Sequence, residues 1–156
     1  MNKKSRGSRG FTLIELLVVI AIIGLLASVI LASLNSARGK GADAAIKSQL
    51  KDLQSQAEIV YDDANPNSYA AVCTNANVEA QVKSAADASG ATYPVFGTNS
   101  NGDSTHAVCN NATSYYVVMV PLKTNSTYGW CVDSDGASRQ VTAANVTSAL
   151  TACPVS

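Results

Sequence analysis

The sequence predicts an α+β protein in which one long N-terminal helix, apolar in its first half, packs on a small antiparallel β-sheet. Three observations carry this prediction. A long apolar run lies near the start of the 156-residue chain, a helical pattern of apolar residues follows it, and strand-like segments occur only towards the C-terminus. The length leaves room for one modest domain besides the helix.

Basic and acidic residues are balanced in number but unevenly distributed. The chain holds 11 of each, and four of the basic residues lie among the first ten positions, where no acidic residue occurs. Residues 11–156 therefore carry seven basic against eleven acidic side chains, a formal charge of −4. This balance argues against nucleic acid as a partner, because binding to phosphates needs a basic surface.

The apolar run covers residues 11–34 and predicts one membrane-spanning helix. Its last 19 residues, from Leu16, contain no ionisable side chain. At about 1.5 Å per residue they span about 28 Å, close to the thickness of the hydrocarbon core of a bilayer. Basic residues before a span favour a cytoplasmic N-terminus, so the rest of the chain should lie outside. A cleaved secretory signal is the alternative, with Ala27 and Ser28 as small residues, but the apolar run continues beyond them.

The start of this run carries the most specific motif in the chain. Residues 9–16, RGFTLIEL, closely resemble the cleavage site of type IV prepilins and type II secretion pseudopilins. The resemblance covers about residues 3–34. It implies that a prepilin peptidase cleaves after Gly10, removes the basic leader and N-methylates the new first residue, Phe11.

Glu15 is the acidic residue that interrupts the apolar run. A carboxylate at membrane depth is costly and is usually paired or functional. Cleavage after Gly10 would create an α-amine on Phe11, one helical turn away. The resemblance implies that Glu15 meets the amine of a neighbouring subunit and sets the register of the helices, an attraction of about 4 kcal/mol at 4 Å before desolvation. An acid tolerated near the membrane interface is the alternative.

The resemblance also implies an architecture, the lollipop of a type IV pilin. Its parts are a basic leader at 1–10, a transmembrane and filament-core helix at 11–34, an amphipathic continuation at 35–63 and an exported globular head at 64–156. The implied location is the bacterial cytoplasmic membrane, crossed once with the N-terminus inside. A filament in the periplasm or on the cell surface would follow.

The function implied is that of a structural subunit, not an enzyme, with no cofactor. The partners implied are the prepilin peptidase, further copies of the chain, other pilins or pseudopilins, membrane lipid before assembly, an inner-membrane platform protein and an assembly ATPase. The motif does not distinguish a type IV pilus, a competence pilus and a type II secretion pseudopilus, nor a major from a minor subunit. A minor pilin that binds DNA or another surface ligand, and a membrane-anchored exported protein, are the alternatives.

The helical pattern continues beyond the apolar run. One apolar face recurs at intervals of four and three residues and consists of Ile46, Leu50, Leu53, Ala57 and Val60. The pattern predicts a helix from Phe11 to about Asp62, about 80 Å long at 1.5 Å per residue. A turn at residues 65–68, NPNS, should end it.

The remaining residues predict the elements of the head. The patterns indicate a short helix at 78–86 closed by Ser89-Gly90, a polar loop at 97–103, and strands at 114–120, 128–132 and 137–141. Residues 133–136, DSDG, should form the hairpin turn between the last two strands.

Four cysteines, Cys73, Cys109, Cys131 and Cys153, all lie in the expected head. Their spacing does not match that of zinc ligands, which favours disulfides over a metal site and leaves buried free thiols as the alternative. The spacing alone leaves three pairings open. The resemblance favours Cys131 with Cys153, because pilins often close a C-terminal loop in this way, and this leaves Cys73 with Cys109.

Other candidate chemistry is sparse. Asp133 and Asp135, with Asp103, are weak candidates for a calcium site, but the spacing of an EF-hand is absent and a solvated hairpin turn is the favoured interpretation. His106 is the single histidine and is expected on the surface of a polar loop. No catalytic residue is predicted, because no nucleophile motif accompanies this histidine.

Overall fold

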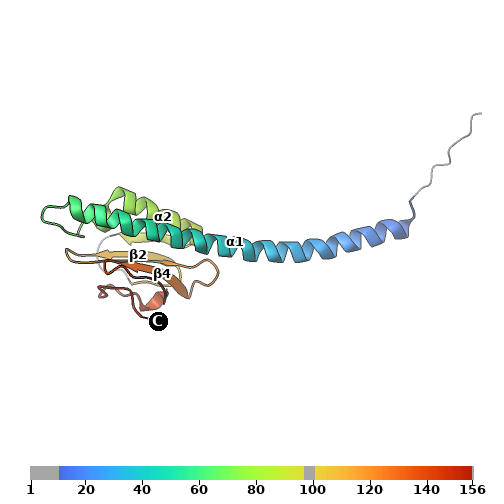
Figure 1. The fold of residues 1–156 in the computed structure, drawn as a ribbon. Helices are drawn as coiled ribbons and strands as arrows, with labels where there is room; N and C mark the ends of the chain where they lie inside the picture. The colour runs from blue at the N-terminus through green and yellow to red at the C-terminus, as the bar shows by residue number, and fades with distance from the viewer. Residues whose placement is uncertain (1–10, 97–100, 156) are drawn as a thin grey trace, which may run out of the picture. The chain divides into compact units, whose positions relative to one another are not determined.

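The computed structural model describes residues 11–96 and 101–155, with the backbone alone for 93–96. The chain divides into two compact units between Ala37 and Arg38. One long helix, α1 (Leu13–Asp63), contributes to both units (Figure 1). The predicted helix is therefore confirmed, and its ends lie within two residues of those expected.

The first unit, as far as it is described, is the apolar half of α1. Every large apolar side chain from Phe11 to Leu34 is exposed, with exposed fractions between 43 and 88%. A helix that is apolar on all sides needs an apolar environment, such as a bilayer or a bundle of similar helices. Within the described residues, α1 is the one helix that is long and apolar enough to cross a membrane.

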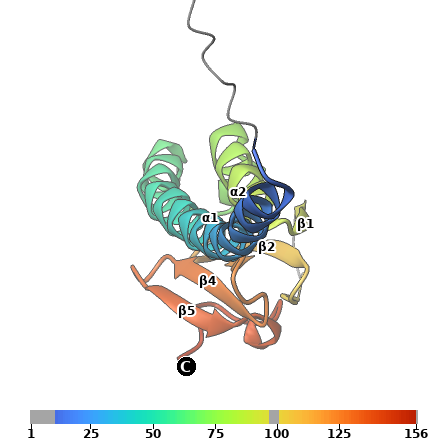
Figure 2. The same ribbon diagram turned by 90° about the vertical axis from the view of Figure 1, so that its right-hand side faces the viewer.

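The second unit contains a five-stranded sheet with the order β1-β2-β3-β4-β5. The strands are β1 (Thr92–Phe96), β2 (His106–Asn111), β3 (Tyr116–Pro121), β4 (Tyr128–Asp133) and β5 (Ser138–Thr142). β1 is parallel to β2, and the other neighbouring pairs are antiparallel. Figure 2 shows α1 and α2 (Ala76–Ser89) over one face of the sheet. Two short 3-10 helices are also described, η1 (Val72–Thr74) and η2 (Ala143–Asn145).

The central strand β3 separates two apolar layers. Tyr116, Val118 and Val120 face the helices, whereas Val117 and Met119 face the C-terminal segment on the opposite side. Successive side chains of a strand point to opposite faces, and here both faces are covered. All of β3 is therefore buried, which explains why its sequence is a continuous apolar run.

The apolar face predicted on α1 packs as expected. All five residues of that face are buried in the layer between the helices and the sheet. A polar contact also fixes α1 near the start of the second unit. The Asp43 carboxylate accepts hydrogen bonds from the backbone N–H groups of Lys123 at 2.6 Å and Thr124 at 3.3 Å, and from the Thr124 hydroxyl. This contact attaches α1 to the loop between β3 and β4.

The short helix predicted at 78–86 is confirmed as α2, which begins two residues earlier than expected. The Asn75 side chain accepts hydrogen bonds from two backbone N–H groups in the first turn of α2. Gly90 follows the last residue of α2 with a φ of 80°, a left-handed conformation that favours glycine. Both ends of α2 thus have sequence signals that the structure uses.

The three predicted strands are confirmed as β3, β4 and β5, and residues 133–136 form the turn between the last two. The sheet is nevertheless larger than predicted, because β1 and β2 extend it. β1 contains a proline and β2 ends in two asparagines, so neither segment has the apolar pattern of a strand.

The position predicted for His106 is wrong. His106 begins β2 and is half-buried, instead of lying in a loop. Of the predicted polar loop, residues 97–100 lie outside the described residues, and 101–103 are described without regular structure.

Candidate functional site

The start of α1 carries the residues predicted to act in assembly. Gly10 lies outside the described residues, whereas Phe11, Thr12 and Glu15 are described and exposed. Glu15 Oε2 accepts hydrogen bonds from the backbone N–H and from the hydroxyl of Thr12, both at 2.8 Å. In return, Thr12 Oγ1 accepts the backbone N–H of Glu15 at 3.3 Å. This reciprocal pair is a capping box, so Glu15 also has a local role in capping α1, besides the role in assembly predicted for it.

The capping box leaves the charge of Glu15 without a cationic partner among the described residues. Its other oxygen, Oε1, accepts no hydrogen bond from these residues. The helix that follows is apolar and exposed, and the apolar surroundings that such a helix needs would have a low dielectric constant. A carboxylate in such surroundings needs a positive charge from another group. The exposed start of α1 is therefore chemically suited to docking a cation.

Both disulfides lie in the second unit and fasten its covering segments to the sheet. Cys73 on η1 is bonded to Cys109 on β2, with Cα atoms 5.7 Å apart. Cys131 on β4 is bonded to Cys153 near the C-terminus, with Cα atoms 5.9 Å apart. The first bond lies in the helix-covered layer and the second in the opposite layer. The structure thus contains the pair that the resemblance favours, Cys131 with Cys153, and the pair that this choice leaves, Cys73 with Cys109.

The Asp133 carboxylate, a calcium candidate by sequence, is buried and bound by backbone groups. Its Oδ1 accepts the N–H groups of Asp135 at 3.1 Å and Ala137 at 2.9 Å, and its Oδ2 accepts that of Cys153 at 2.7 Å. Asp133 is 1% exposed, whereas Asp135 is exposed. One carboxylate therefore shapes the β4–β5 turn and holds the C-terminal segment. The described residues contain no group of three or more histidine, cysteine or acidic side chains placed as metal ligands.

We expect Asp133→Asn to lower the free energy of unfolding by about 1–3 kcal/mol. The substitution keeps the size of the side chain but replaces one acceptor oxygen with an amide donor, which leaves at least one buried backbone N–H without a partner. Thermal unfolding of the full-length protein in detergent, followed by circular dichroism, measures the change. Asp135→Asn is the matched control at an exposed position, with an expected change of at most about 0.5 kcal/mol. Equal effects of the two substitutions would contradict the role of the buried carboxylate.

A second polar cluster surrounds the start of β2. Asp103 Oδ1 accepts the backbone N–H groups of Thr105 and His106, and Asp103 Oδ2 lies 2.7 Å from His106 Nδ1. Partial burial would raise the pKa of the Asp103 carboxyl, but the hydrogen bonds from Thr105 and His106 outweigh it and hold the pKa at about 2. The Thr105 hydroxyl also lies 2.8 Å from Nδ1. A catalytic triad uses the two different ring nitrogens of its histidine, so this cluster is not arranged as one.

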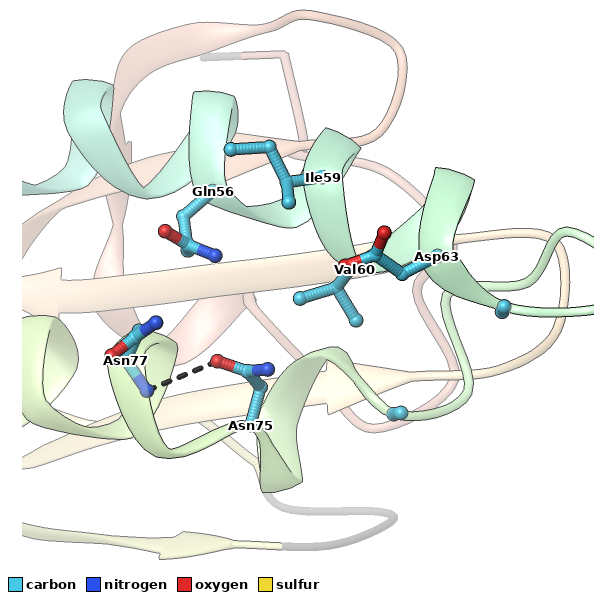
Figure 3. A pocket seen from close by; sticks show the side chains of 8 residues that line it. Gln56, Ile59, Val60, Asp63, Asn75 and Asn77 are labelled. Atoms are coloured by element: carbon cyan, nitrogen blue, oxygen red, sulfur yellow. Dashed lines mark hydrogen bonds between the residues drawn. The ribbon is translucent and has the colours of Figure 1, made fainter.

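An open hollow of about 410 Å³ lies between the end of α1 and the start of α2 (Figure 3). One of its lining side chains, Ile59, is 53% exposed. Another, Asn75, directs its oxygen to the backbone N–H of Asn77 as part of the cap of α2. An open hollow with an exposed apolar side chain is suited to contact with another protein surface more than to enclosing a small molecule.

Comparisons with known proteins bear on the N-terminal segment. Residues 5–31 match the family model of the prokaryotic N-terminal methylation motif. The chain is 49% identical over 47 residues to the type IV wide pilus major component PilA4 of Thermus thermophilus, a match that covers 30% of this chain and 36% of that protein. The chain thus spans about a third of the length of this relative. No solved structure matches the chain.

Proposed function

We propose that this chain is a structural subunit of the type IV pilin and pseudopilin family and that it assembles into a helical filament through α1; the matches of its N-terminal segment support the proposal. One observation carries the proposal: the methylation motif coincides with the start of a helix whose apolar side chains are exposed on all sides. In the membrane, lipid would cover these side chains. In a filament, the same half of α1 in neighbouring copies would replace the lipid.

Maturation in this proposal begins at the leader. A prepilin peptidase cleaves after Gly10 and N-methylates the new α-amine of Phe11. Cleavage removes the four basic residues of the leader and leaves one amine, which is mostly protonated at neutral pH. Glu15 supplies the matching negative charge to an adjacent copy. An inner-membrane platform protein and an assembly ATPase then move the subunit from lipid into the filament.

The filament we propose is a type IV pilus, because the named relative is a major component of one. The head offers little support for capture of DNA. Residues 64–156 contain three basic against five acidic side chains, a formal charge of −2. A surface with this balance repels phosphate groups over most of its area.

Intact-mass and N-terminal analysis of the native protein tests the proposal, on membranes and on material sheared from cells. We expect the sheared species to begin at N-methylated Phe11 and to gain four hydrogens on reduction, two for each disulfide. The same mature species confined to the membrane would favour a pseudopilin or a minor subunit. A chain that keeps Met1 in both fractions would overturn the proposal.

We expect Gly10→Val to block removal of the leader and, with it, the appearance of sheared filaments. Glycine has no Cβ, so its backbone can approach another chain closely, whereas a β-branched side chain before the cleaved bond obstructs the peptidase. The variant should remain in the membrane as a larger, unmethylated species by intact mass. Gly7→Val, at another glycine of the leader, is the matched control and should mature normally. Normal maturation of Gly10→Val would place the cleavage site elsewhere.

A further inference from the structure

The basic residues of the chain are gathered just after the apolar run. Of the seven basic side chains in residues 11–156, four lie within residues 38–51, where Asp43 is the one acidic residue. The next part of α1, residues 52–63, contains four acidic side chains and no basic one. Residues 38–51 therefore carry a formal charge of +3, although residues 11–156 as a whole are acidic.

Two of these basic residues lie at the very start of the second unit, on either side of Gly39. This glycine lies against the loop between β3 and β4, since a Cβ at this position would come within 3.1 Å of Thr124 Cγ2. Successive residues of an α-helix are turned by about 100°, so Arg38 and Lys40 lie on the two flanks of that contact. Both side chains are exposed. We call Arg38 and Lys40 the basic pair.

The basic pair forms no salt bridge with a described residue. Asp43 is three residues from Lys40, but its carboxylate binds the loop between β3 and β4 instead. The neighbouring Lys123 differs from the pair in this respect. Its amine lies beside Gly90 at the C-terminal end of α2, where the helix dipole favours a cation. Folding of the second unit therefore explains Lys123, but it does not explain the two charges of the basic pair.

With the apolar run across a bilayer, the basic pair lies at the level of the lipid headgroups. Arg38 follows Leu34, the last residue of the run, by four positions and Lys40 by six, or about 6 and 9 Å at 1.5 Å per residue of α1. The headgroup layer is about 5–8 Å thick on each side of the hydrocarbon core. Helical side chains lean towards the N-terminus, and the long stems of arginine and lysine extend towards the interface. Both cations can therefore reach the lipid phosphates.

Insertion into the membrane opposes the basic pair and does not explain it. Basic residues close to a span favour the cytoplasmic side, whereas Arg38 and Lys40 follow the span on the side predicted to be exported. The four basic residues of the leader have to outweigh this effect. Two exposed cations that disfavour the predicted orientation, and that have no acidic partner within the described unit, are suited to a negatively charged partner at the membrane surface.

We propose that Arg38 and Lys40 bind the phosphate groups of anionic phospholipids in the exported leaflet of the membrane that α1 spans. The guanidinium can offer two parallel donors to one phosphate, and the ammonium acts as a point charge. The inference rests on the membrane stage of the proposed function and deepens it, because it names the class of lipid and the residues that contact it.

The distance from the membrane confines the contact to the basic pair. Each basic residue near an anionic surface strengthens binding about fivefold. The effect falls off over a Debye length of about 8 Å at physiological salt. Lys47 and Lys51 lie seven and eleven residues beyond Lys40, or about 10 and 17 Å further along α1, and should contribute little.

Native mass spectrometry of the full-length chain, purified from membranes in a nonionic detergent, tests the inference. The probes are dioleoylphosphatidylglycerol and dioleoylphosphatidylcholine in equal amounts, which share their acyl chains and differ in headgroup. We expect the wild type to retain the anionic lipid preferentially and R38Q/K40Q to lose about tenfold or more of this preference. R38K/K40R keeps both charges and should keep the preference. K47Q/K51Q is the matched control, an equal loss of charge further along α1, and should bind like the wild type.

Three results would overturn the inference. The first is an unchanged preference in R38Q/K40Q. The second is an equal loss in K47Q/K51Q, because net charge would then be the cause. The third is displacement of the anionic lipid by millimolar inorganic phosphate, which would show a site for the free anion and not for a lipid. Intact mass must show the same N-terminus in every variant, because the basic leader would itself attract anionic lipid.

The outcomes separate this inference from the proposed function. If R38Q/K40Q loses the preference although wild-type cells yield no mature sheared protein, the filament function fails and the lipid contact stands. If mature protein is sheared from cells and the preference does not depend on the basic pair, the lipid contact alone is wrong.

Discussion

Glu15→Gln is expected to leave the chain cleaved, methylated and inserted, but to lower the yield of sheared filaments about tenfold or more. Glutamine keeps the size of the side chain and also serves in a capping box, so the start of α1 stays intact. What is lost is the negative charge. Its attraction to an amine is about 4 kcal/mol before desolvation, and a net loss of about 1.4 kcal/mol is already tenfold.

Two further variants separate the charge of Glu15 from its capping role. Glu15→Ala removes both and should assemble as poorly as Glu15→Gln. Thr12→Ala removes the partner in the cap but keeps the charge, so it should cost the helix about 1 kcal/mol and leave assembly close to normal. Sheared and membrane fractions, quantified by immunoblot and intact mass, give the comparison. Normal filaments from Glu15→Gln, with none from Glu15→Ala, would show that capping is the function of this residue.

Removal of either disulfide is expected to destabilise the second unit by about 3–4 kcal/mol. In the chain-entropy model, the separations of 36 and 22 residues correspond to about 3.8 and 3.4 kcal/mol. Replacing both cysteines of a pair with alanine avoids a reactive free thiol. Thermal unfolding of the full-length protein in detergent measures the loss. A loss below about 1 kcal/mol for either pair would contradict a stabilising role for that bond.

Two interactions hold the C-terminal segment, and their contributions to the free energy of unfolding should not be additive. The disulfide at Cys153 and the hydrogen bond from the Cys153 N–H to Asp133 fasten the same backbone. Loss of the disulfide frees the segment, so a further Asp133→Asn change should cost less than it does alone. Changes in the free energy of unfolding are not additive when two interactions hold the same segment. Removal of the distant disulfide at Cys73 should therefore add its full effect to that of Asp133→Asn.

The parts of the fold that the sequence predicts are those in which local pattern and burial agree. The intervals of four and three residues on α1 correspond to the face that packs, and the β-branched run of β3 corresponds to a strand buried on both sides. β1 and β2 do not have this agreement. Asn110 on β2 is a buried polar residue, 2% exposed, which breaks the apolar pattern. β1 pairs in parallel with β2, which is a contact of the tertiary fold and not a feature of the local sequence.

In the candidate site too, features set by the local sequence were predictable and features set by the tertiary fold were not. A motif of adjacent residues, which needs no knowledge of the fold, indicates Glu15. Thr12 and Glu15, three positions apart, are also the sequence signature of the capping box. The role of Asp133 was not accessible in this way. It depends on the backbone of Cys153, 20 residues further along, returning to the β4–β5 turn.

α1 supplies five buried side chains to the layer that covers the sheet. A soluble fragment for recombinant production should therefore not begin after the end of that helix. A fragment that starts at residue 64 would leave the apolar surface of α2 and the sheet uncovered, and we expect it to aggregate. A fragment that starts at residue 38 retains all five side chains and omits the apolar half. Crystallisation trials and antigens for antibodies should therefore begin inside the helix, at a position that no loop or turn marks.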